Sequence, residues 1–214
     1  MSIHTGQLAG HDYSYVIGDP SSNIVLLLLH GTGGDESKLL QLGEDINADA
    51  HFLSPRGNVS ENGNRRFFKR HGEGIFDEED IKKRAKELKK FIESAKSVHK
   101  LDGKEIVAVG YSNGANIAAS VMLLYPGVFK KAVMFRPMLP LRPADIPDLH
   151  GSKILMTNGI QDPLVPHPNV EELRLLLESY GAEVDQHWLP TGHQLTSQDV
   201  LLAKKWVAKI DKNI

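Results

Sequence analysis

The sequence predicts an α/β fold in which a mainly parallel sheet carries helices on both faces. The first observation is that short apolar runs alternate with helical patterns along most of the chain. The second is the run IVLLLL at residues 24–29, which is apolar on both faces, as a strand covered by helices on each side must be. The third is length. Since 214 residues can bury one sizeable core, we expect a single domain over residues 1–214.

The N-terminal part of the chain contains the first expected elements. Residues 13–17 (YSYVI) form a short, partly alternating strand that we expect at an edge of the sheet, and residues 23–30 form the buried strand. A helix is expected across residues 38–47. A short strand at residues 51–55 follows it and ends at a proline, so strand and helix already alternate here.

Residues 56–77 show no periodicity and read as a long loop rich in Gly and Asn. A loop of this length in a compact domain is usually functional or mobile. It nevertheless carries three aromatic residues: Phe67, Phe68 and Phe76. Two interpretations stay open, because these rings could line an acyl or aryl site or could tie the loop to the core.

A long amphipathic helix follows this loop. Asp77 is its expected N-terminal cap, and apolar residues then recur at spacings of four and three: Ile81, Ala85, Leu88, Ile92 and Ala95. The basic run at residues 82–90 (KKRAKELKK) is therefore the solvent-facing side of a helix. Since the net charge is −2 and no extended basic face is visible, we expect no nucleic-acid partner.

The alternation of strands and helices continues to the C-terminus. Strands are expected at residues 105–110, 131–135, 153–159 and 183–189. Helices are expected at residues 113–124, at residues 170–180 before Gly181, and across residues 200–210. A proline-broken segment at residues 136–147 separates two of the strands. In such sheets ligands bind outside the carboxyl ends of the strands, so functional side chains are expected just after each strand.

The composition is typical of a soluble globular protein, with 41% hydrophobic and 24% charged residues. The absence of cysteine excludes disulfides, thiolate catalysis and thiolate metal sites. The longest apolar run is too short to span a bilayer, and the N-terminus lacks a basic region followed by an apolar one. We therefore expect a cytoplasmic protein with no membrane partner.

Ser112 is the first candidate catalytic residue. The segment Gly110-Tyr111-Ser112-Asn113-Gly114 matches G-x-S-x-G and joins an expected buried strand to an expected helix. In so tight a turn, side chains two positions either side of the serine would clash with neighbouring backbone, and glycine avoids the clash. The alternative is an ordinary Gly-Ser turn. As a nucleophile, the serine hydroxyl would need an adjacent base.

His193 is the expected base among ten histidines, because it follows the last strand and precedes the last helix. His187 lies inside a strand, and His167 lies between two prolines.

Asp162 is the expected acid, since it follows the strand at residues 153–159 at the same end of the sheet. The alternative carboxylates are Asp185, inside a strand, and Asp148, in an irregular segment. Asp162 could also be part of an ordinary Asp-Pro turn with no catalytic role. The order Ser112, Asp162, His193 is that of α/β-hydrolases.

The loop after the first buried strand, LHGTGGDE at residues 29–36, is the expected source of an oxyanion hole. The backbone N–H of Thr32 can point to the same spot as that of Asn113. A phosphate cradle is the competing interpretation, but Glu36 occupies the third glycine position of G-x-G-x-x-G and no G-K-[ST] occurs. No H-E-x-x-H or comparable spacing supports a metal site, so we expect neither a metal nor a cofactor.

Four motifs in order, LHGTGGDE, GYSNGANIA, NGIQDPLVP and LPTGHQLT, resemble the small carboxylesterase/phospholipase branch of the α/β-hydrolases. This branch is kin to acyl-protein thioesterases and dienelactone hydrolases. The stretches FFKRHGEGIFDEEDI and MFRPMLP most resemble bacterial carboxylesterases linked to the methylhydroquinone response. The resemblance implies serine ester hydrolysis without a cofactor. It also implies Ser112, Asp162 and His193 as the triad, with the N–H groups of Thr32 and Asn113 as the oxyanion hole.

Two departures bear on the closer relatives. Acyl-protein thioesterases typically have glutamine after the serine, where this chain has Asn113, and dienelactone hydrolases use a cysteine that this chain lacks. We expect an α/β-hydrolase fold without a separate cap domain, so that residues 56–77 and 136–147 shape an open, shallow pocket. The expected substrate is a small-molecule ester of a small or medium acyl group. A thioesterase or lysophospholipase, a non-catalytic small-ligand receptor and a homodimer stay open as alternatives.

Overall fold

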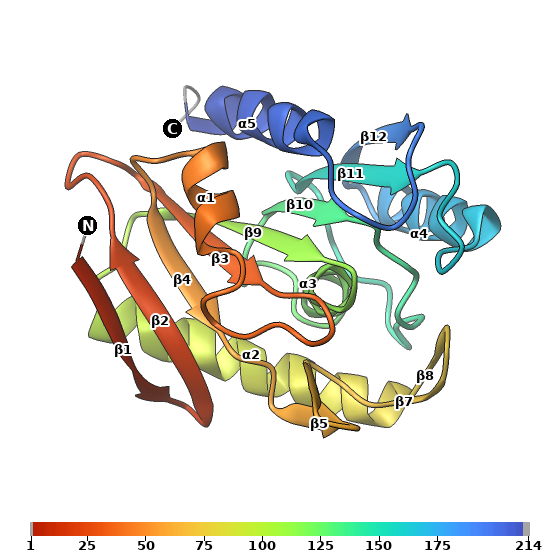
Figure 1. Ribbon diagram of the computed structural model, residues 1–214, viewed down its shortest axis with the longest axis horizontal. Coiled ribbons are helices and arrows are strands. Elements are labelled where there is room, and N and C mark those ends of the chain that lie inside the picture. The colour runs from red at the N-terminus through yellow and green to blue at the C-terminus, as the bar shows by residue number, and fades with distance from the viewer. Residues whose placement is uncertain (1, 212–214) are drawn as a thin grey trace.

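The protein is built around an eight-stranded, mainly parallel sheet (Figure 1). The structure is a computed structural model that describes residues 2–211. In spatial order the strands are β1 (Ser2–Leu8), β2 (His11–Ile17), β4 (His51–Pro55), β3 (Ile24–Leu29), β9 (Glu105–Tyr111), β10 (Lys131–Phe135), β11 (Lys153–Gly159) and β12 (Glu183–Leu189). β2 runs antiparallel to both of its neighbours, and all other pairs are parallel. The predicted fold class is confirmed.

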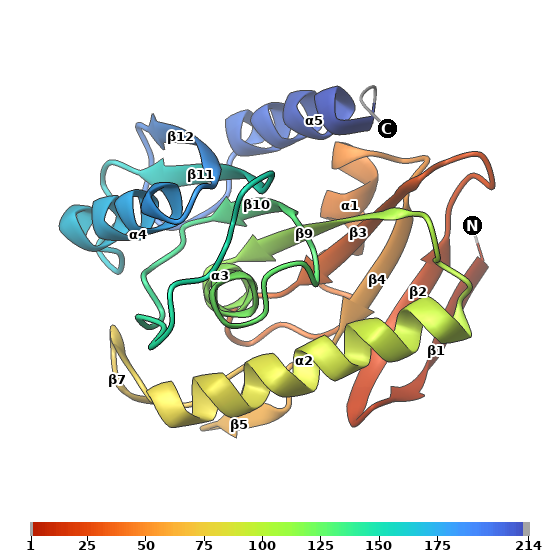
Figure 2. The same ribbon diagram turned by 180° about the vertical axis from the view of Figure 1, so that it is seen from behind.

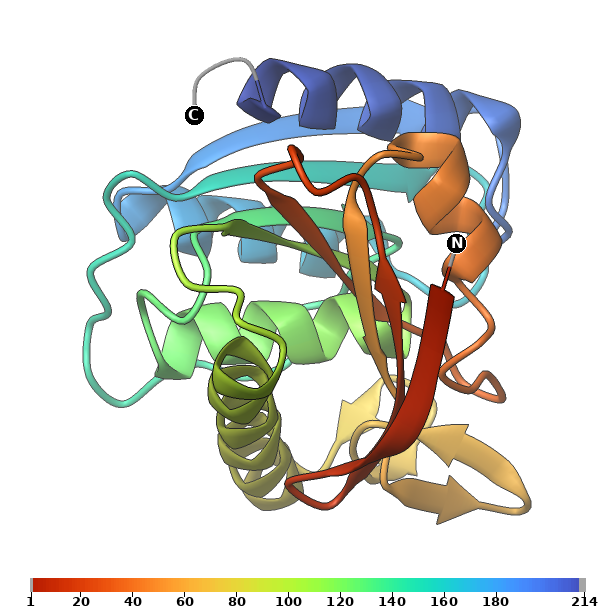
Figure 3. The ribbon, with the colours of Figure 1, turned by 90° about the vertical axis from the view of Figure 1, so that its left-hand side faces the viewer.

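Helices cover both faces of the sheet, and a layer of buried side chains lies between the sheet and the helices on each face. They are α1 (Leu40–Ile46), α2 (Glu78–Val98), α3 (Asn113–Leu124), α4 (His167–Ser179) and α5 (Ser197–Asp211). Figure 3 shows α1 and α5 above the sheet with α2 and α3 below it, and Figure 2 shows α4 on the same face as α2 and α3. Two clusters of buried side chains, one on each face, match this layering. None of the helices within residues 2–211 is both long and apolar enough to cross a membrane.

The long helix α2 forms as its sequence predicts. The Asp77 carboxylate accepts a hydrogen bond from the Asp80 backbone N–H at 3.0 Å, and so caps the first turn. The apolar residues at spacings of four and three are fully buried, with 0% of their surface exposed, and they pack against α3 and the sheet. The lysines of residues 82–90 lie on the opposite, wetter side.

Two parts of the sequence-based expectation are wrong. The strand at residues 13–17 does not lie at the edge, because β1 pairs along its outer side. β1 was not expected since its side chains are nearly all exposed, so no apolar pattern marks it. The segment of residues 56–77 is not a plain loop but contains two short hairpins, β5 (Val59–Glu61) with β6 (Asn64–Arg66) and β7 (Arg70–Gly72) with β8 (Ile75–Phe76).

The carboxyl ends of the central strands meet at one edge of the sheet. Leu29 of β3 lies beside Gly110 of β9, Tyr111 lies beside Phe135 of β10, and Phe135 lies beside Thr157 of β11. The loops that follow β3, β9, β11 and β12 therefore open toward the same space. This alignment is what brings the distant candidate residues within reach of one another.

Candidate active site

Ser112 lies on a strained turn between β9 and α3. Its backbone has φ 53° and ψ −115°, a region that a residue with a side chain rarely adopts. A Cβ at Gly110 would lie 2.5 Å from the Gly114 carbonyl oxygen, and a Cβ at Gly114 would lie 1.9 Å from the Leu29 carbonyl oxygen. Both distances are far below van der Waals contact, so the predicted reason for the two glycines is confirmed.

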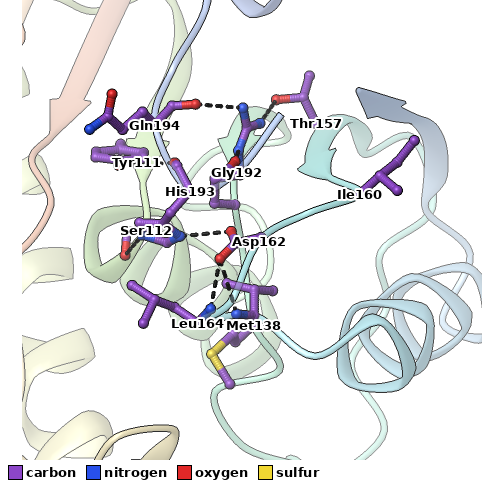
Figure 4. Close-up of polar contacts among 12 residues, drawn as sticks. Tyr111, Ser112, Met138, Thr157, Ile160, Asp162, Leu164, Gly192, His193 and Gln194 are labelled. Carbon is purple, nitrogen blue, oxygen red and sulfur yellow. Dashed lines mark hydrogen bonds and ion pairs between the residues drawn. The ribbon is translucent and has the colours of Figure 1, made fainter. Parts of the chain in front are cut away.

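The structure brings Ser112, His193 and Asp162 into one hydrogen-bonded row (Figure 4). His193 Nε2 lies 3.0 Å from Ser112 Oγ, and His193 Nδ1 lies 2.7 Å from Asp162 Oδ2. An ionised carboxylate can only accept, so Nδ1 donates to Asp162. Nε2 then presents its lone pair to the serine hydroxyl, which is the arrangement a general base requires.

The Asp162 carboxylate is itself held in place from behind. Its Oδ1 accepts hydrogen bonds from the backbone N–H of Leu164 at 2.9 Å and of Val165 at 3.3 Å. The side chain of Asp162 is 1% exposed, whereas that of His193 is 19% exposed. The acid is therefore buried and fixed in orientation, while the imidazole remains reachable from the cavity.

The alternative histidines and carboxylates have partners elsewhere. His187 Nε2 lies 3.0 Å from Asp185 Oδ1 on the exposed part of β12. His167 Nε2 donates to the Ile160 carbonyl at 3.0 Å, and its ring packs against Trp188. Asp148 accepts from the exposed His150. The loop after β12 thus supplies a histidine to Ser112, and the strand itself does not.

The loop after β3 is fixed next to Ser112 by a buried histidine. His30 Nδ1 lies 2.7 Å from the Gly31 carbonyl, and His30 Nε2 accepts the Gly57 N–H at 2.9 Å. One nitrogen donates and the other accepts, so the ring is neutral. Burial lowers the pKa of His30 and keeps it in this form. Both Thr32 and Asn113 line the cavity beside Ser112, and within residues 2–211 neither backbone N–H is engaged in a hydrogen bond.

The Asn113 side chain has a role that sequence reasoning missed. Its Oδ1 accepts the Phe67 backbone N–H at 2.7 Å and so ties residues 56–77 to the turn that carries Ser112. Phe67 and Phe68 are buried in the core at 2% and 0% exposure, whereas Phe76 faces the cavity. The three rings therefore divide between the two interpretations: two anchor the segment and one lines the site.

A cavity of about 320 Å³ opens beside Ser112. Its apolar wall comes from both segments expected to shape it and from the turn after Asp162: Phe76, Met138, Leu164 and Val165. Its polar wall includes Arg66, Arg70, Glu73 and Asn116. Residues 2–211 contain no group of three or more His, Asp or Glu side chains able to hold a metal ion.

A second unexpected feature is a fully buried ion pair behind the site. Arg136 and Asp199 are both 0% exposed, and Arg136 Nη1 lies 2.7 Å from Asp199 Oδ1. Burial by itself raises the pKa of the Asp199 carboxyl, but hydrogen bonds from Arg136, Thr157 and Thr196 outweigh it and hold that pKa below its usual value. The pair joins residues 63 positions apart, so no local pattern could have revealed it.

Comparison with known proteins identifies a family and several similar proteins and structures. The model of the phospholipase/carboxylesterase family matches residues 16–211. The chain is 47% identical over 186 residues to MhqD of Bacillus subtilis (strain 168), a hydrolase by name, which covers 87% of this chain and 93% of that protein. A Bacillus cereus carboxylesterase is 47% identical with a TM-score of 0.90, covering 93% of this chain and 94% of that chain. A carboxylesterase from Mesorhizobium loti is 32% identical with a TM-score of 0.91, and the match covers 97% of this chain and 99% of that chain.

Proposed function

Because this chain belongs to the phospholipase/carboxylesterase family of α/β-hydrolases, we propose that it hydrolyses carboxylic esters through an acyl-enzyme on Ser112. The observation that carries the proposal is the row of two hydrogen bonds, 3.0 Å from Ser112 to His193 and 2.7 Å from His193 to Asp162. A serine hydroxyl needs such a base to become a nucleophile at neutral pH, and the base needs a carboxylate to fix its tautomer.

In the first half of the reaction, Ser112 Oγ attacks the ester carbonyl carbon while its proton passes to His193 Nε2. The carbonyl oxygen becomes an oxyanion, and Asp162 stabilises the imidazolium that forms at the same time. The bond to the alcohol then breaks as His193 returns the proton to the leaving oxygen. In the second half, water gives a proton to His193 and attacks the acyl-serine. His193 then returns this proton to Ser112 Oγ as the acyl–oxygen bond breaks, which releases the carboxylic acid and restores Ser112.

The oxyanion is stabilised by the backbone N–H groups of Thr32 and Asn113. Asn113 is the first residue of α3, so its N–H is one of the free donors at a helix N-terminus. Thr32 is held on the other side, because its Oγ1 accepts from Arg66 Nη1 at 2.9 Å and the neighbouring Gly33 N–H donates to the Arg65 carbonyl at 2.9 Å. Such preorganised donors need no reorganisation as the charge develops.

The size of the cavity favours small or medium acyl groups. A volume of about 320 Å³ is at the lower end for small-molecule sites. Phe76, Met138, Leu164 and Val165 give the acyl or alcohol part an apolar wall. The proposed chemistry uses the side chains and backbone of this chain alone and requires no cofactor.

Labelling with a fluorophosphonate tests the nucleophile. The Ser112 oxygen is expected to displace fluoride from phosphorus in the wild-type protein, and the label is expected to be absent from Ser112→Ala. A folded wild-type protein that takes up no label and cleaves no ester would refute the proposal and favour a non-catalytic small-ligand receptor.

A substrate panel then defines the leaving group and chain length. We expect aryl and alkyl esters from acetyl to octanoyl to be cleaved, with kcat/KM falling for longer chains. The panel includes an acyl thioester and a lysophospholipid, because a thioesterase or lysophospholipase would use the same residues. A clear preference for either compound over every simple ester would replace the carboxylesterase assignment.

A further inference from the structure

Arg136 lies directly after β10, at the edge of the sheet where the candidate site opens. Its backbone has φ 55°, and its N–H donates to the Thr157 carbonyl at 2.9 Å, which fixes it to β11. The preceding residue, Phe135, accepts the Ser112 N–H through its carbonyl oxygen at 2.9 Å. The end of β10 therefore fixes the turn that carries Ser112 on one side, and Arg136 lies on its other side.

All five N–H donors of the Arg136 guanidinium are used. Nη1 donates to Asp199 Oδ1 at 2.7 Å and to Thr157 Oγ1 at 3.0 Å. Nη2 donates to Asp199 Oδ2 at 2.9 Å and to the Gln194 carbonyl at 2.9 Å. Nε donates to the Gly192 carbonyl at 3.2 Å. A buried guanidinium satisfied at every donor is held in a single orientation.

Two of these acceptors are the carbonyls on either side of His193. The carbonyl of His193 itself accepts from the Tyr111 hydroxyl at 3.1 Å. Three consecutive carbonyls, at residues 192, 193 and 194, thus each receive a hydrogen bond from a side chain at the end of β9 or β10 (Figure 4). Burial raises the pKa of Tyr111, so its hydroxyl keeps the proton that it donates.

The carboxylate side of the ion pair is anchored equally well. Asp199 Oδ1 accepts from Thr157 Oγ1 at 2.6 Å, and Asp199 Oδ2 accepts from the backbone N–H and the hydroxyl of Thr196, both at 2.8 Å. Asp199 lies in the first turn of α5, so it also fixes where the loop that carries His193 runs into this helix. The loop is thus held to β10 and β11 through Arg136 and to α5 through Asp199.

We propose that Arg136, oriented by Asp199, is a positioning residue that sets the place of the His193 imidazole relative to Ser112. This inference rests on the proposed function, since it assigns to Arg136 the support of the proposed base. Residues 190–196 lie outside the helices and strands, and their backbone hydrogen bonds to other backbone groups are at the two ends, at Thr191 and Thr196, so the path of the part around His193 depends on the side-chain contacts above. A misplacement of about 1 Å at a reacting group can cost about 10²-fold in rate.

Lysine cannot replace Arg136 in this role. Its ammonium is a compact charge with three donors, and it lacks the planar fork that reaches two carbonyls and both carboxylate oxygens together. Arg136→Lys therefore keeps the charge that neutralises Asp199 but releases the carbonyls of Gly192 and Gln194. This separates positioning from charge balance. Tyr111→Phe removes the middle hydrogen bond and leaves the ion pair intact.

The matched control is Arg174→Lys. Arg174 also bonds two carboxylate oxygens, Glu171 Oε2 at 3.0 Å and Glu178 Oε2 at 2.6 Å, but it lies on α4 away from the cavity. The concentration of competent sites in each variant is determined by fluorophosphonate titration, and kcat is expressed per titrated site. A merely structural Arg136 would lower the number of folded molecules and leave kcat per site unchanged.

We expect kcat per site to fall about 10²-fold in Arg136→Lys with KM little changed, a smaller fall in Tyr111→Phe, and no change in Arg174→Lys. A second readout does not depend on turnover: the NMR signal of the His193 Nδ1 proton, which is shielded from exchange while it is bonded to Asp162. We expect this signal to broaden or vanish in Arg136→Lys and to persist in Arg174→Lys. A folded Arg136→Lys protein with the wild-type signal and wild-type kcat per site would overturn the inference. If the wild-type protein hydrolyses no ester but the signal is still lost in Arg136→Lys, the positioning role is upheld and the proposed function is refuted.

Discussion

Replacing Asp162 by asparagine tests the acid of the proposed triad, and the hydrogen bonds of the structure dictate how the amide will sit. Oδ1 of Asp162 accepts two backbone N–H groups, those of Leu164 and Val165. The amide oxygen of the variant must take this position, because an NH₂ group there would face two donors. The NH₂ group is therefore directed at His193 Nδ1, where the carboxylate oxygen now lies at 2.7 Å.

This orientation reverses the tautomer of His193. Facing a donor, Nδ1 must accept, so the proton moves to Nε2, and the nitrogen 3.0 Å from Ser112 Oγ can no longer take the serine proton. The same exchange in a serine protease triad lowers kcat by about 10⁴, which corresponds to about 5.5 kcal/mol of transition-state stabilisation. Since the Asp162 side chain is 1% exposed, little water can substitute for the lost carboxylate. We therefore expect kcat to fall by about 10³- to 10⁴-fold, as in that precedent.

The assay is steady-state hydrolysis of an aryl acetate with kcat and KM measured separately. The loss should appear in kcat, because Asp162 acts only once charge develops on the imidazole. The melting temperature should change little, since the amide oxygen keeps both backbone hydrogen bonds. Asp185→Asn is the control, because Asp185 pairs with His187 on β12. If Asp162→Asn keeps kcat within about tenfold of the wild type, or Asp185→Asn is the crippled variant, the assignment of Asp162 is wrong.

Three further predictions follow from the described residues. Gly114→Ala would place a Cβ 1.9 Å from the Leu29 carbonyl oxygen, so urea unfolding should show a loss of about 3 kcal/mol or more; an unchanged midpoint would contradict the packing argument. Phe68→Ala should lower stability by about 3–5 kcal/mol with unchanged ester preference. Phe76→Ala should shift chain-length preference instead, and equal effects of the two variants would refute the division of roles. Burial lowers the pKa values of four histidines below 6.5: His11, His30, His51 and His99. As the pH falls, the unfolded chain therefore takes up protons before the folded protein does, and the free energy of unfolding should fall as the pH drops below 6.5. A urea midpoint that is constant from about pH 7.5 to about 5.5 would contradict this.

The parts of the fold that could be predicted are those with a periodic apolar pattern. The buried strand β3 and the helix α2 are examples, because burial on both faces or on one stripe leaves a mark in the sequence. β1 left none, since its side chains are exposed and its pairing comes from backbone hydrogen bonds to β2. The hairpin of β5 and β6 did carry a local signal: Asn62 and Gly63 have φ values of 50° and 82°, the turn that an Asn-Gly pair favours.

The candidate site divides in the same way. Ser112, Asp162 and His193 could be located because each follows a recognisable strand, and parallel strands end at a common edge. The Asn113 side chain could not, because its partner is the backbone of Phe67, 46 residues away, in a segment without a pattern. Arg136 looked like one charged residue in a proline-broken segment. Its role depends on a contact with Asp199, which only the folded chain brings near.

The two buried carboxylates near His193 are distinguished by their counter-charges. Asp199 is neutralised by Arg136, with both side chains 0% exposed, so the negative charge on that side of the loop is already compensated. Among the ion pairs of residues 2–211, Asp162 has His193 as its partner, and its other hydrogen bonds come from neutral backbone N–H groups. One uncompensated negative charge therefore faces the imidazole, at 2.7 Å and with little exposure to water, where it is best placed to stabilise a positive charge that appears only during the reaction. The carboxylate that holds the loop thus does not compete with the carboxylate that faces the ring. For this reason Asp162→Asn is expected to act on kcat through the imidazolium charge, whereas Arg136→Lys is expected to act through the position of the ring.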